Sequence, residues 1–384
     1  MRVLHILEAT GGGTARHVVD LIEGLTAMGV ENHLVYSSLR ADAFWRAHLG
    51  ALERRGVSLL EVPMRRSPHP SDLKALATVA SYVAREAPFD IFHGHSSKGG
   101  ALARALKIFF PSARVVYNPH AFVTLSPRLK PAEKLLYSMV ERGLGLLTDG
   151  FILGSSFEHE EFLRLGLSGK AFRIIPPTGI RPLAESPANR ESVRRAWGLR
   201  GDEVVFGFVG RLDHQKAPEV ALEAFARFVQ GFPGETRFVM VGEGRLHGEL
   251  RSRVRELGLE GKVIFPGYQE GRSVMPGFDV FVLSSLYESA GIVLLEAADA
   301  GLPILTTPVG WARDIVAHGV NGFIYPIGDY QALAHYMHLL ASDGSLRKAM
   351  GEESRRRASG ITLDRTFKET YTFYKEILKK EGAW

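Results

Sequence analysis

Residues 278–296 read FDVFVLSSLYESAGIVLLE and predict a strand, a turn and a helix in immediate succession. The apolar run 278–283 is typical of a buried strand, and the segment 293–300 is typical of a helix. Glu288 and Glu296 therefore lie on either side of a strand-to-helix turn. In open α/β sheets this edge is where ligands bind, although the helix dipole also favours acidic residues at a helix start. The rest of the chain decides between a binding site and two solvated side chains.

Strand-like and helix-like segments alternate along the whole chain, which predicts a mainly parallel sheet flanked by helices. Strands are expected at residues 2–7, 33–37, 58–62, 91–95, 114–118, 150–153 and 173–175, and then at 204–209, 237–241, 263–265, 280–283, 304–306 and 322–325. Helices are expected at residues 17–28, 41–55, 71–86, 99–109, 131–143 and 363–380, with further helices between the strands of the second set.

A proline-rich segment separates the two sets of strands. It contains Pro176-Pro177-Thr178-Gly179, Arg181-Pro182 and Ser186-Pro187, which break local structure and predict a linker. A chain of 384 residues also exceeds what one core normally supports. We therefore predict an α/β protein with two Rossmann-like domains facing across a cleft. Their expected limits are 1–180 and 181–362, with a C-terminal helix, 363–384, that crosses back to pack on the N-terminal domain.

The composition is that of a soluble globular protein with 45% hydrophobic residues. There is no run of about 18 uncharged apolar residues, so no membrane-spanning helix is expected. The N-terminus lacks the long apolar region of a signal peptide. The chain has no cysteine, which excludes disulfides, thiolate nucleophiles and cysteine-ligated zinc. We expect a cytoplasmic protein, with peripheral attachment to the inner face of the membrane as an extension of that expectation.

The positive charge lies in the first half of the chain. Residues 1–180 hold 21 Lys and Arg against 16 Asp and Glu, whereas the remainder is balanced. This excess suggests an anionic partner for the first half, such as a phospholipid surface or a phosphorylated acceptor, and a chance asymmetry is the alternative. Basic and aromatic residues do not cluster together, which argues against a nucleic-acid partner.

A glycine loop, Gly11-Gly12-Gly13-Thr14, follows the first strand and precedes a helix. Glycines there allow close approach of a ligand to the backbone, and the helix N-terminus favours anions. The dinucleotide fingerprint requires a third glycine, where this chain has Arg16, and an acid after the second strand, which closes at Tyr36-Ser37-Ser38. A nicotinamide cofactor is therefore not expected. A plain tight turn is the alternative.

Two cations follow the first strand of the second half, within Gly210-Arg211-Leu212-Asp213-His214-Gln215-Lys216. Arg211 and Lys216 leave the carboxyl edge of the sheet together, and two fixed cations there would neutralise a diphosphate. Ordinary surface charge is the alternative for this segment alone. Glu288 and Glu296 on a parallel loop of the same domain weaken that alternative.

These residues together resemble the retaining, nucleotide-sugar-dependent glycosyltransferases of GT-B architecture, glycosyl transferases group 1, particularly members that build bacterial polysaccharides and glycolipids. The resemblance covers nearly the whole chain. Its motifs in chain order are the glycine loop, Gly210-Arg211-Leu212 with Lys216, Val241-Gly242-Glu243-Gly244, Val263-Ile264-Phe265-Pro266-Gly267, the two glutamates, and Gly310 through Asn321-Gly322-Phe323 to Asp329.

The resemblance implies roles for the charged residues. Arg211 and Lys216 would bind the donor diphosphate and stabilise it as the leaving group. Glu288 would contact the donor sugar, and Glu296 would hold the ribose hydroxyls. The chain departs from the family pattern at Ala290, where a phenylalanine is usual, and this leaves the identity of the sugar open.

Further donor contacts implied by the resemblance come from small or neutral residues. Gly12 and Gly13 would approach the diphosphate and sugar from the other domain. Gly267 and Tyr268 would lie beside the base. Backbone N–H groups near Gly291, Ile292 and Val293 would contact the phosphates.

The first domain is expected to bind the acceptor. Ser96, Ser97 and Lys98 follow a strand and stand at a helix start, which suits an anion or hydroxyl site, and helix capping is the alternative. The preceding His93 and His95 suggest a metal pair, but no third ligand is evident in the sequence. We therefore expect no metal and no cofactor besides the donor.

His120, in Asn118-Pro119-His120-Ala121, also ends a strand. The resemblance implies that it lies close to the reacting sugar and positions donor and acceptor, and a structural histidine is the alternative. Nearby Arg128, Lys130 and Lys134, with leucines between them, form a basic amphipathic segment that suits a membrane-bound acceptor or an ordinary helix face.

The sequence thus predicts an enzyme that transfers a sugar from a nucleotide-diphosphate sugar to an acceptor hydroxyl with retention and without a metal. The resemblance favours a UDP-sugar, with a GDP-sugar as the alternative, and a lipid-linked or surface-polysaccharide acceptor. A nucleotide-sugar epimerase or a phosphorylase on the same fold remains open, as does a non-catalytic subunit that binds nucleotide sugars.

Overall fold

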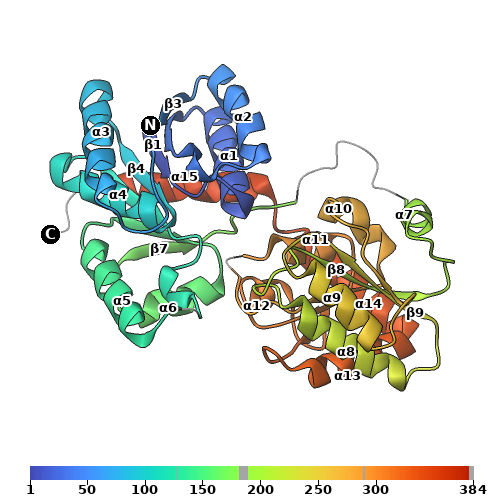
Figure 1. The fold of residues 1–384 in the computed structure, drawn as a ribbon. Helices are drawn as coiled ribbons and strands as arrows, with labels where there is room; N and C mark the ends of the chain where they lie inside the picture. Colours follow the sequence, from blue (N-terminus) through green and yellow to red (C-terminus); the bar gives the residue numbers. More distant parts are fainter. Residues whose placement is uncertain (128, 181–188, 289, 380–384) are drawn as a thin grey trace. The chain divides into compact units, whose positions relative to one another are not determined.

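The computed structural model describes residues 1–127, 129–180, 189–288 and 290–379. The chain forms two compact units, which are Met1–Gly179 with the segment beginning at Thr362, and Ile180–Ile361 (Figure 1). The linker expected at Arg181-Pro182 and Ser186-Pro187 lies outside the described residues. Each unit is built around a parallel sheet of its own, which confirms the α/β prediction.

The sheet of the first unit has seven parallel strands in the order β3-β2-β1-β4-β5-β6-β7. Its central strands are almost completely buried, as expected for a sheet covered by helices on both faces. The strands are β1 (Arg2–Leu7), β2 (Glu31–Tyr36), β3 (Ser58–Glu61), β4 (Ile91–His95), β5 (Arg114–Asn118), β6 (Gly150–Leu153) and β7 (Ala171–Ile174).

Helices connect these strands in the alternation that the sequence predicts. The α-helices of the first unit are α1 (Gly12–Ala27), α2 (Ala43–Arg54), α3 (Ser71–Glu86), α4 (Ser96–Phe109), α5 (Pro131–Gly145), α6 (Ser156–Arg164) and α15 (Leu363–Lys379). Two short 3₁₀ helices, η1 (Ser38–Arg40) and η2 (Val123–Leu125), lie in loops.

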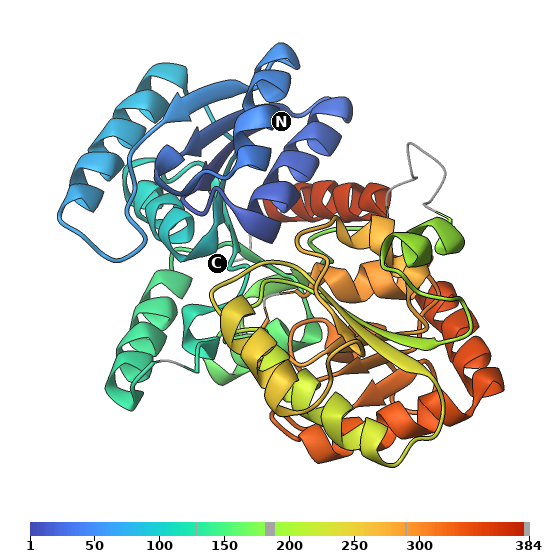
Figure 2. The same cartoon turned by 45° about the vertical axis from the view of Figure 1, so that its right-hand side comes forward.

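Helix α15 belongs to the first unit although it follows the second in the sequence. Its Phe373, Tyr374 and Ile377 are buried in one cluster with Val3 and Leu21. Figures 1 and 2 both show α15, in red, beside α1. The helix therefore completes the core on one face of the first sheet.

The second unit has six parallel strands in the order β10-β9-β8-β11-β12-β13. These strands are β8 (Val204–Val209), β9 (Thr236–Val241), β10 (Val263–Ile264), β11 (Val280–Leu283), β12 (Ile304–Thr306) and β13 (Gly322–Ile324). Its helices are α7 (Arg190–Ala196), α8 (Pro218–Gln230), α9 (His247–Glu256), α10 (Gly271–Val274), η3 (Met275–Gly277), α11 (Ile292–Asp299), α12 (Ala312–Ile315), α13 (Tyr330–Ser342) and α14 (Gly344–Ala358).

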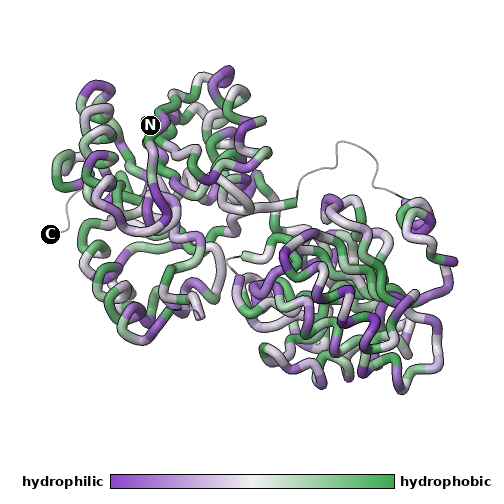
Figure 3. The backbone as a smooth tube through the Cα atoms, in the orientation of Figure 1, coloured by the Kyte–Doolittle hydropathy of each residue, from purple (hydrophilic) through white to green (hydrophobic). Residues whose placement is uncertain are grey.

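Two apolar clusters, one on each face, hold the second sheet between its helices. Figure 3 shows the hydrophobic stretches along the central strands of this unit, with hydrophilic residues at its periphery. Phe206 and Phe208 point to one face of β8, and Val205 and Val209 to the other. This alternation explains why β8 reads as a continuous apolar run in the sequence.

Two helices begin earlier than the sequence pattern predicts. Helix α1 begins at Gly12 instead of residue 17, and α4 begins at Ser96 instead of residue 99. The glycines that read as loop and the serines before residue 99 thus form the first helical turn, which brings backbone N–H groups to the strand ends. The sequence analysis did not predict α6, whose start is capped by Ser155 accepting a hydrogen bond from the Glu158 N–H.

Candidate functional site

Candidate residues of the second unit gather where its strand order reverses. The chain runs from β8 through β9 to β10 and then returns to place β11 on the other side of β8. In open α/β sheets, ligands bind at the carboxyl ends of the strands at such a point. Arg211 and Lys216 follow β8, and Glu288 follows β11. The structure therefore brings the predicted cations and the predicted carboxylate to one edge.

The contact that joins the two loops is an ion pair. Lys216 Nζ lies 2.6 Å from Glu288 Oε1, and both side chains are mostly buried. The Ser285 hydroxyl donates to the same oxygen at 2.7 Å. Glu288 Oε2 makes no hydrogen bond within the described residues, so this oxygen is available to a hydroxyl of a ligand.

The backbone of the two loops is also held together. The Ser284 hydroxyl donates to the carbonyl of Ala217 at 2.8 Å, and the Leu286 N–H donates to the Gln215 carbonyl at 2.9 Å. Ala217 has a left-handed backbone, with φ 44°, directly before α8. Lys216 and Glu288 are therefore positioned by the fold as well as by their mutual attraction.

Arg211 differs from Lys216 in its surroundings. Its side chain is exposed and makes no ion pair or hydrogen bond within the described part of the chain. An unpaired guanidinium presents a planar set of donors that matches the oxygens of a phosphate. The chemistry of Arg211 thus fits an anionic ligand better than a structural role.

Helix α11 supplies the next group of predicted contacts. Gly291 adopts φ 75° as its N-cap, and this left-handed conformation favours glycine. Ile292 and Val293 form the first turn, where backbone N–H groups lack partners within the helix. One turn further on, Glu296 lies against α10, because a Cβ atom added at Gly271 would come within 2.3 Å of Glu296 Oε2. Ser289 lies outside the described residues.

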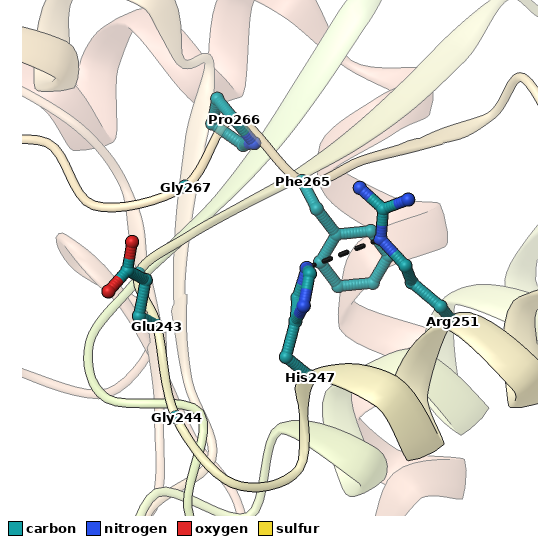
Figure 4. Close-up of a pocket in the computed structure, with 8 residues that line it drawn as sticks. Glu243, Gly244, His247, Arg251, Phe265, Pro266 and Gly267 are labelled. Carbon is teal, nitrogen blue, oxygen red and sulfur yellow. Dashed lines mark hydrogen bonds between the residues drawn. The ribbon is translucent and has the colours of Figure 1, made fainter.

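A pocket of about 530 Å³ opens at the carboxyl ends of β9 and β10. Figure 4 shows His247 and Arg251 beside the Phe265 ring, with Glu243 on the other side of the pocket. Arg251 Nε lies 3.3 Å from His247 Nε2, and its guanidinium stands over Phe265 at 5.8 Å. Gly267 lines this pocket, and the next residue, Tyr268, has 70% of its surface exposed. An exposed aromatic ring beside a pocket suits a planar base.

Ala290, the departure from the family pattern, is buried. Its side chain belongs to the apolar cluster under α11, and its carbonyl accepts a hydrogen bond from the Trp311 N–H at 2.8 Å. The residue therefore contributes to packing at the base of the Glu288 loop.

The order of the first sheet reverses between β1 and β4. The glycine loop follows β1, and its Gly12 N–H donates to Asp42 Oδ2 at 2.9 Å. Asp42 also caps α2 by accepting from the Trp45 N–H at 2.9 Å. A carboxylate of the protein thus already occupies the first N–H group of α1. Gly13 in the same turn is exposed.

The three residues predicted to bind the acceptor lie in the first turn of α4. Ser96 has φ 59°, and its buried hydroxyl has no hydrogen-bond partner within the described residues. Lys98 is committed elsewhere, because its ammonium group pairs with Asp72 and donates to the Ser67 carbonyl. The structure therefore leaves Ser96 and Ser97 at this edge and turns the Lys98 charge toward α3.

Five histidines gather at the same reversal point. His5 lies in β1, His17 in α1, His93 and His95 in β4, and His120 after β5. His95 contacts both neighbours, with 3.0 Å to His5 and 3.1 Å to His120. Burial lowers the pKa of His5 and His17 to about 4 and that of the other three well below the usual value.

His93, His95 and His120 were predicted from the sequence as candidate site residues, whereas His5 and His17 were not. Their strand register gives a signal, because His5 pairs with His93 in neighbouring parallel strands and His95 follows at the alternate position. His17 comes from α1, and no spacing rule in the sequence links it to β4. Its Nδ1 bonds the Pro177 carbonyl, which is distant in the sequence.

The fold brings further histidines to His93 and His95, beside which the sequence shows no third ligand. Ring nitrogens lie within 4.8 Å of one another in two groups, His5 with His93 and His95, and His17 with His95 and His120. The sequence could not reveal these groups because β1, α1 and the loop after β5 come together only in the fold. The chemistry of either group is compatible with a divalent transition metal.

Backbone strain marks the same edges. Four non-glycine residues of the described chain have positive φ angles: Ser96, His120, Ala121 and Ala217. Ser96 directly follows β4, His120 and Ala121 lie in the loop after β5, and Ala217 ends the loop between β8 and α8. Such conformations cost about 1–3 kcal/mol each and concentrate at functional sites. Glu158 supports the strained Ala121 by accepting its N–H, and burial raises the pKa of Glu158 to about 7.

Family models match both halves of the chain. Residues 189–357 match the family model Glycosyl transferases group 1, and residues 12–178 match the Glycosyl transferase 4-like domain. The chain belongs to the group 1 glycosyltransferases. The family predicted from the sequence is thereby confirmed.

Two relatives illustrate the range of this family. The EpsD protein of Bacillus subtilis is 28% identical over 369 residues, which are 91% of this glycosyltransferase and 95% of EpsD. An Escherichia coli enzyme, UDP-Gal:alpha-D-GlcNAc-diphosphoundecaprenol alpha-1,3-galactosyltransferase, is 27% identical over 278 residues, 71% of each chain.

Solved structures confirm the fold class. The crystal structure of Anabaena HepE, in complex with UDP, superimposes with a TM-score of 0.81 and covers 98% of this glycosyltransferase and 100% of HepE. At 20% identity this likeness shows the fold alone, which is the GT-B arrangement of two Rossmann-like domains. Within the described residues, no helix is long and apolar enough to span a membrane.

Proposed function

We propose that this glycosyltransferase moves a sugar from a UDP-sugar to a hydroxyl of a lipid-linked or surface-polysaccharide intermediate, with retention of anomeric configuration. The observation that carries the proposal is the meeting of Arg211, Lys216 and Glu288 at the reversal point of the second sheet. The family supports a sugar transfer, and the named substrate of the E. coli relative supports a UDP donor and a lipid-linked acceptor.

Arg211 and Lys216 would act on the leaving group. Cleavage of the bond between sugar and diphosphate places negative charge on the diphosphate, and fixed cations stabilise that charge without reorganisation. Arg211 has no competing partner in the described chain, and Lys216 is held beside the site by Glu288. Backbone N–H groups of Gly291, Ile292 and Val293 would add donors at the phosphates.

Glu288 and Glu296 would orient the donor by its hydroxyl groups. Glu288 Oε1 already accepts from Ser285, so Oε2 is the oxygen available to the sugar. Glu296 lies one turn along α11 and would hold the ribose hydroxyls. The base would lie near Gly267 and Tyr268, at the pocket lined by Phe265.

The first unit would bind the acceptor. The buried Ser96 hydroxyl and the Asn118 amide nitrogen lack hydrogen-bond partners within the described residues, and hydroxyl groups of a glycan would satisfy them. Ser97 lies in the same turn. His120, partly buried on its strained loop, would contact a hydroxyl group of a substrate.

Helix α5 supports a membrane-bound acceptor. Its Leu135, Leu136, Met139 and Val140 side chains are between 45% and 62% exposed. Lys130 stands exposed at the start of the helix, and cations beside an apolar face favour anionic lipid. We propose that this face rests on the membrane that carries the acceptor. Arg128, also named for this surface, lies outside the described residues.

Transfer would not require a metal, because Arg211 and Lys216 supply positive charge at the diphosphate. The test is to incubate the protein with UDP-sugars and lipid-linked acceptors and to analyse the product by NMR, with and without a chelator. An elongated acceptor that keeps the anomeric configuration, formed equally with chelator, is expected. Epimerised sugar without acceptor, or dependence on inorganic phosphate, would overturn the proposal.

A further inference from the structure

A chain of hydrogen-bonded side chains crosses four neighbouring strands of the first sheet. It runs from Asn32 in β2 through His5 in β1 and His95 in β4 to His120 after β5. Asn32 Oδ1 lies 3.1 Å from His5 Nε2, His5 Nδ1 lies 3.0 Å from His95 Nε2, and His95 Nδ1 lies 3.1 Å from His120 Nε2. Each imidazole nitrogen can be a donor or an acceptor. The direction of hydrogen-bond donation along the chain is therefore set by the group at its end.

The Asn32 end has a fixed direction. Asn32 Nδ2 lies 3.1 Å from the Val30 carbonyl, which can only accept, and 2.9 Å from Thr26 Oγ1. Thr26 in turn donates its proton to the Ile22 carbonyl, so its oxygen accepts from Asn32. The amide nitrogen is therefore oriented toward two acceptors, and the Asn32 oxygen faces His5.

This orientation determines which ring nitrogen carries the proton in each histidine along the chain. Because Asn32 Oδ1 only accepts, His5 carries its proton on Nε2 and offers a lone pair at Nδ1. His95 must then donate from Nε2, which leaves its own Nδ1 as an acceptor. His120 must donate from Nε2 to that acceptor. The last ring thus keeps a lone pair at Nδ1, which makes no hydrogen bond within the described residues.

These assignments require each ring to be neutral, with a proton on only one of its two nitrogens. The surroundings of the rings supply that condition, because each hydrogen bond along the chain joins a ring to the Asn32 amide or to another imidazole, and neither stabilises a buried imidazolium as a carboxylate would. His5 and His95 are fully buried. Near neutral pH the rings are therefore neutral imidazoles.

We propose that Asn32, His5 and His95 are positioning residues that hold His120 as the Nε2–H tautomer, so that its Nδ1 accepts a hydrogen bond from a substrate hydroxyl. A lone pair at Nδ1 recognises an O–H group and disfavours a phosphate oxygen. The chemical class of the group that His120 reads is thereby a sugar or acceptor hydroxyl. The tautomer assignment is independent of the proposed function, and only the identity of the hydroxyl rests on it.

His17 provides an internal contrast. Its Nδ1 faces the Pro177 carbonyl, which can only accept, so His17 carries its proton on Nδ1. Its Nε2 is buried without a hydrogen-bond partner in the described residues. The ring stands 4.9 Å from His120 but is not hydrogen-bonded into the chain. Two neighbouring histidines are therefore expected to be opposite tautomers.

The experiment is NMR of the whole protein labelled with ¹⁵N-histidine, which reports which ring nitrogen carries the proton. The wild type is expected to show Nε2–H for His5, His95 and His120, and Nδ1–H for His17. A proton on His120 Nδ1 in the wild type would overturn the proposal without the use of any variant.

Three variants test the positioning role. His5→Phe removes both nitrogens from the chain and should give mixed tautomers at His120. His5→Gln restores a donor toward Asn32 and an acceptor toward His95, so it should restore the single tautomer. His93→Phe is the matched control, because the ring centroids of His93 and His95 are 4.0 Å apart yet His93 is hydrogen-bonded to Tyr374 instead.

Sugar transfer supplies the second readout. His5→Phe should lower kcat by about tenfold or more, because a wrong histidine tautomer disables a substrate contact, while His5→Gln and His93→Phe should stay within about twofold of the wild type. An unchanged tautomer and kcat in folded His5→Phe would overturn the proposal. A protein that shows the predicted tautomers but transfers no sugar would overturn the proposed function and leave the tautomer chain intact.

Discussion

Lys216 Nζ lies 2.6 Å from Glu288 Oε1, so the cation proposed for the diphosphate is neutralised by the carboxylate proposed for the sugar. The two residues come from different loops, one after β8 and one after β11. A diphosphate that enters this site gives Lys216 a second anionic partner and competes with Glu288 for the same charge. Donor binding and the geometry of the sugar contact are therefore coupled.

Replacement of Glu288 by glutamine should separate these two effects. Glu288→Gln keeps an acceptor for Ser285 but removes the charge that neutralises Lys216. We expect UDP affinity to stay the same or rise by up to about tenfold, whereas kcat for transfer falls about 100-fold because the sugar loses its carboxylate. Calorimetry and initial rates measure the two quantities. A parallel loss of both would contradict this coupling.

Gly271→Ala should weaken nucleotide binding without unfolding the protein. A Cβ atom at this position would meet Glu296 Oε2 at 2.3 Å, and the end of a flexible side chain can move away. We expect KM for the donor to rise about tenfold, since a displaced Glu296 loses a hydrogen bond from the ribose worth about 1.5 kcal/mol. Gly248→Ala is the control, because nothing lies within 4 Å of a Cβ there. Equal KM values for both variants would contradict the role of Glu296.

The exposed face of α5 should mediate binding to anionic vesicles. Leu135→Gln combined with Met139→Gln removes two exposed apolar side chains from that face. We expect at least about tenfold weaker sedimentation with phosphatidylglycerol vesicles, since each buried side chain contributes about 1.5–3 kcal/mol, and unchanged transfer to a water-soluble acceptor. Leu73→Gln, which alters a more exposed leucine on α3, serves as the control. Equal vesicle binding by both variants would assign α5 no membrane role.

Acid should destabilise the first unit before it affects the second. Between the ordinary histidine pKa of 6.5 and about 4, the unfolded chain binds protons that His5 and His17 in the folded chain do not. Stability therefore falls as the pH falls, by up to about 1.4 kcal/mol per pH unit for each such histidine. Glu158, whose pKa is raised to about 7, acts in the opposite direction and offsets one histidine above pH 4.5.

Hydrogen exchange of β1 and β4, corrected for the intrinsic effect of pH, measures this loss. Protection should decrease from pH 6.5 to pH 5. In His5→Gln, the slope of the free energy of unfolding against pH should be smaller by the contribution of one proton. A flat profile in the wild type would contradict the buried neutral state of the histidines.

The local patterns of the sequence were sufficient to predict most of the fold. β8 and β11 have the predicted limits because continuous apolar runs bounded by turn residues depend on short-range pattern alone. The predicted start of α1 was wrong, because three glycines disfavour a helix in isolation and tertiary packing overrides that preference.

The candidate site was predicted only where a motif at the end of a strand marks each residue. Arg211, Lys216 and Glu288 follow strands that become neighbours, so a motif at each strand end was enough to associate them. The commitment of Lys98 to Asp72 was not visible, because α3 and α4 meet only in the folded unit. The chain of Asn32, His5 and His95 was hidden for the same reason, since its links join residues 27 to 90 positions apart.

Calorimetric titration of UDP into Arg211→Ala and Lys216→Ala tests the central claim, that these two cations hold the diphosphate of a UDP-sugar. The wild type is expected to bind UDP, and each variant should bind UDP about 10- to 100-fold more weakly, as expected for loss of a charged hydrogen bond. Uridine, which has no diphosphate, should bind equally to all three proteins. Unchanged UDP affinity in both folded variants would contradict the account.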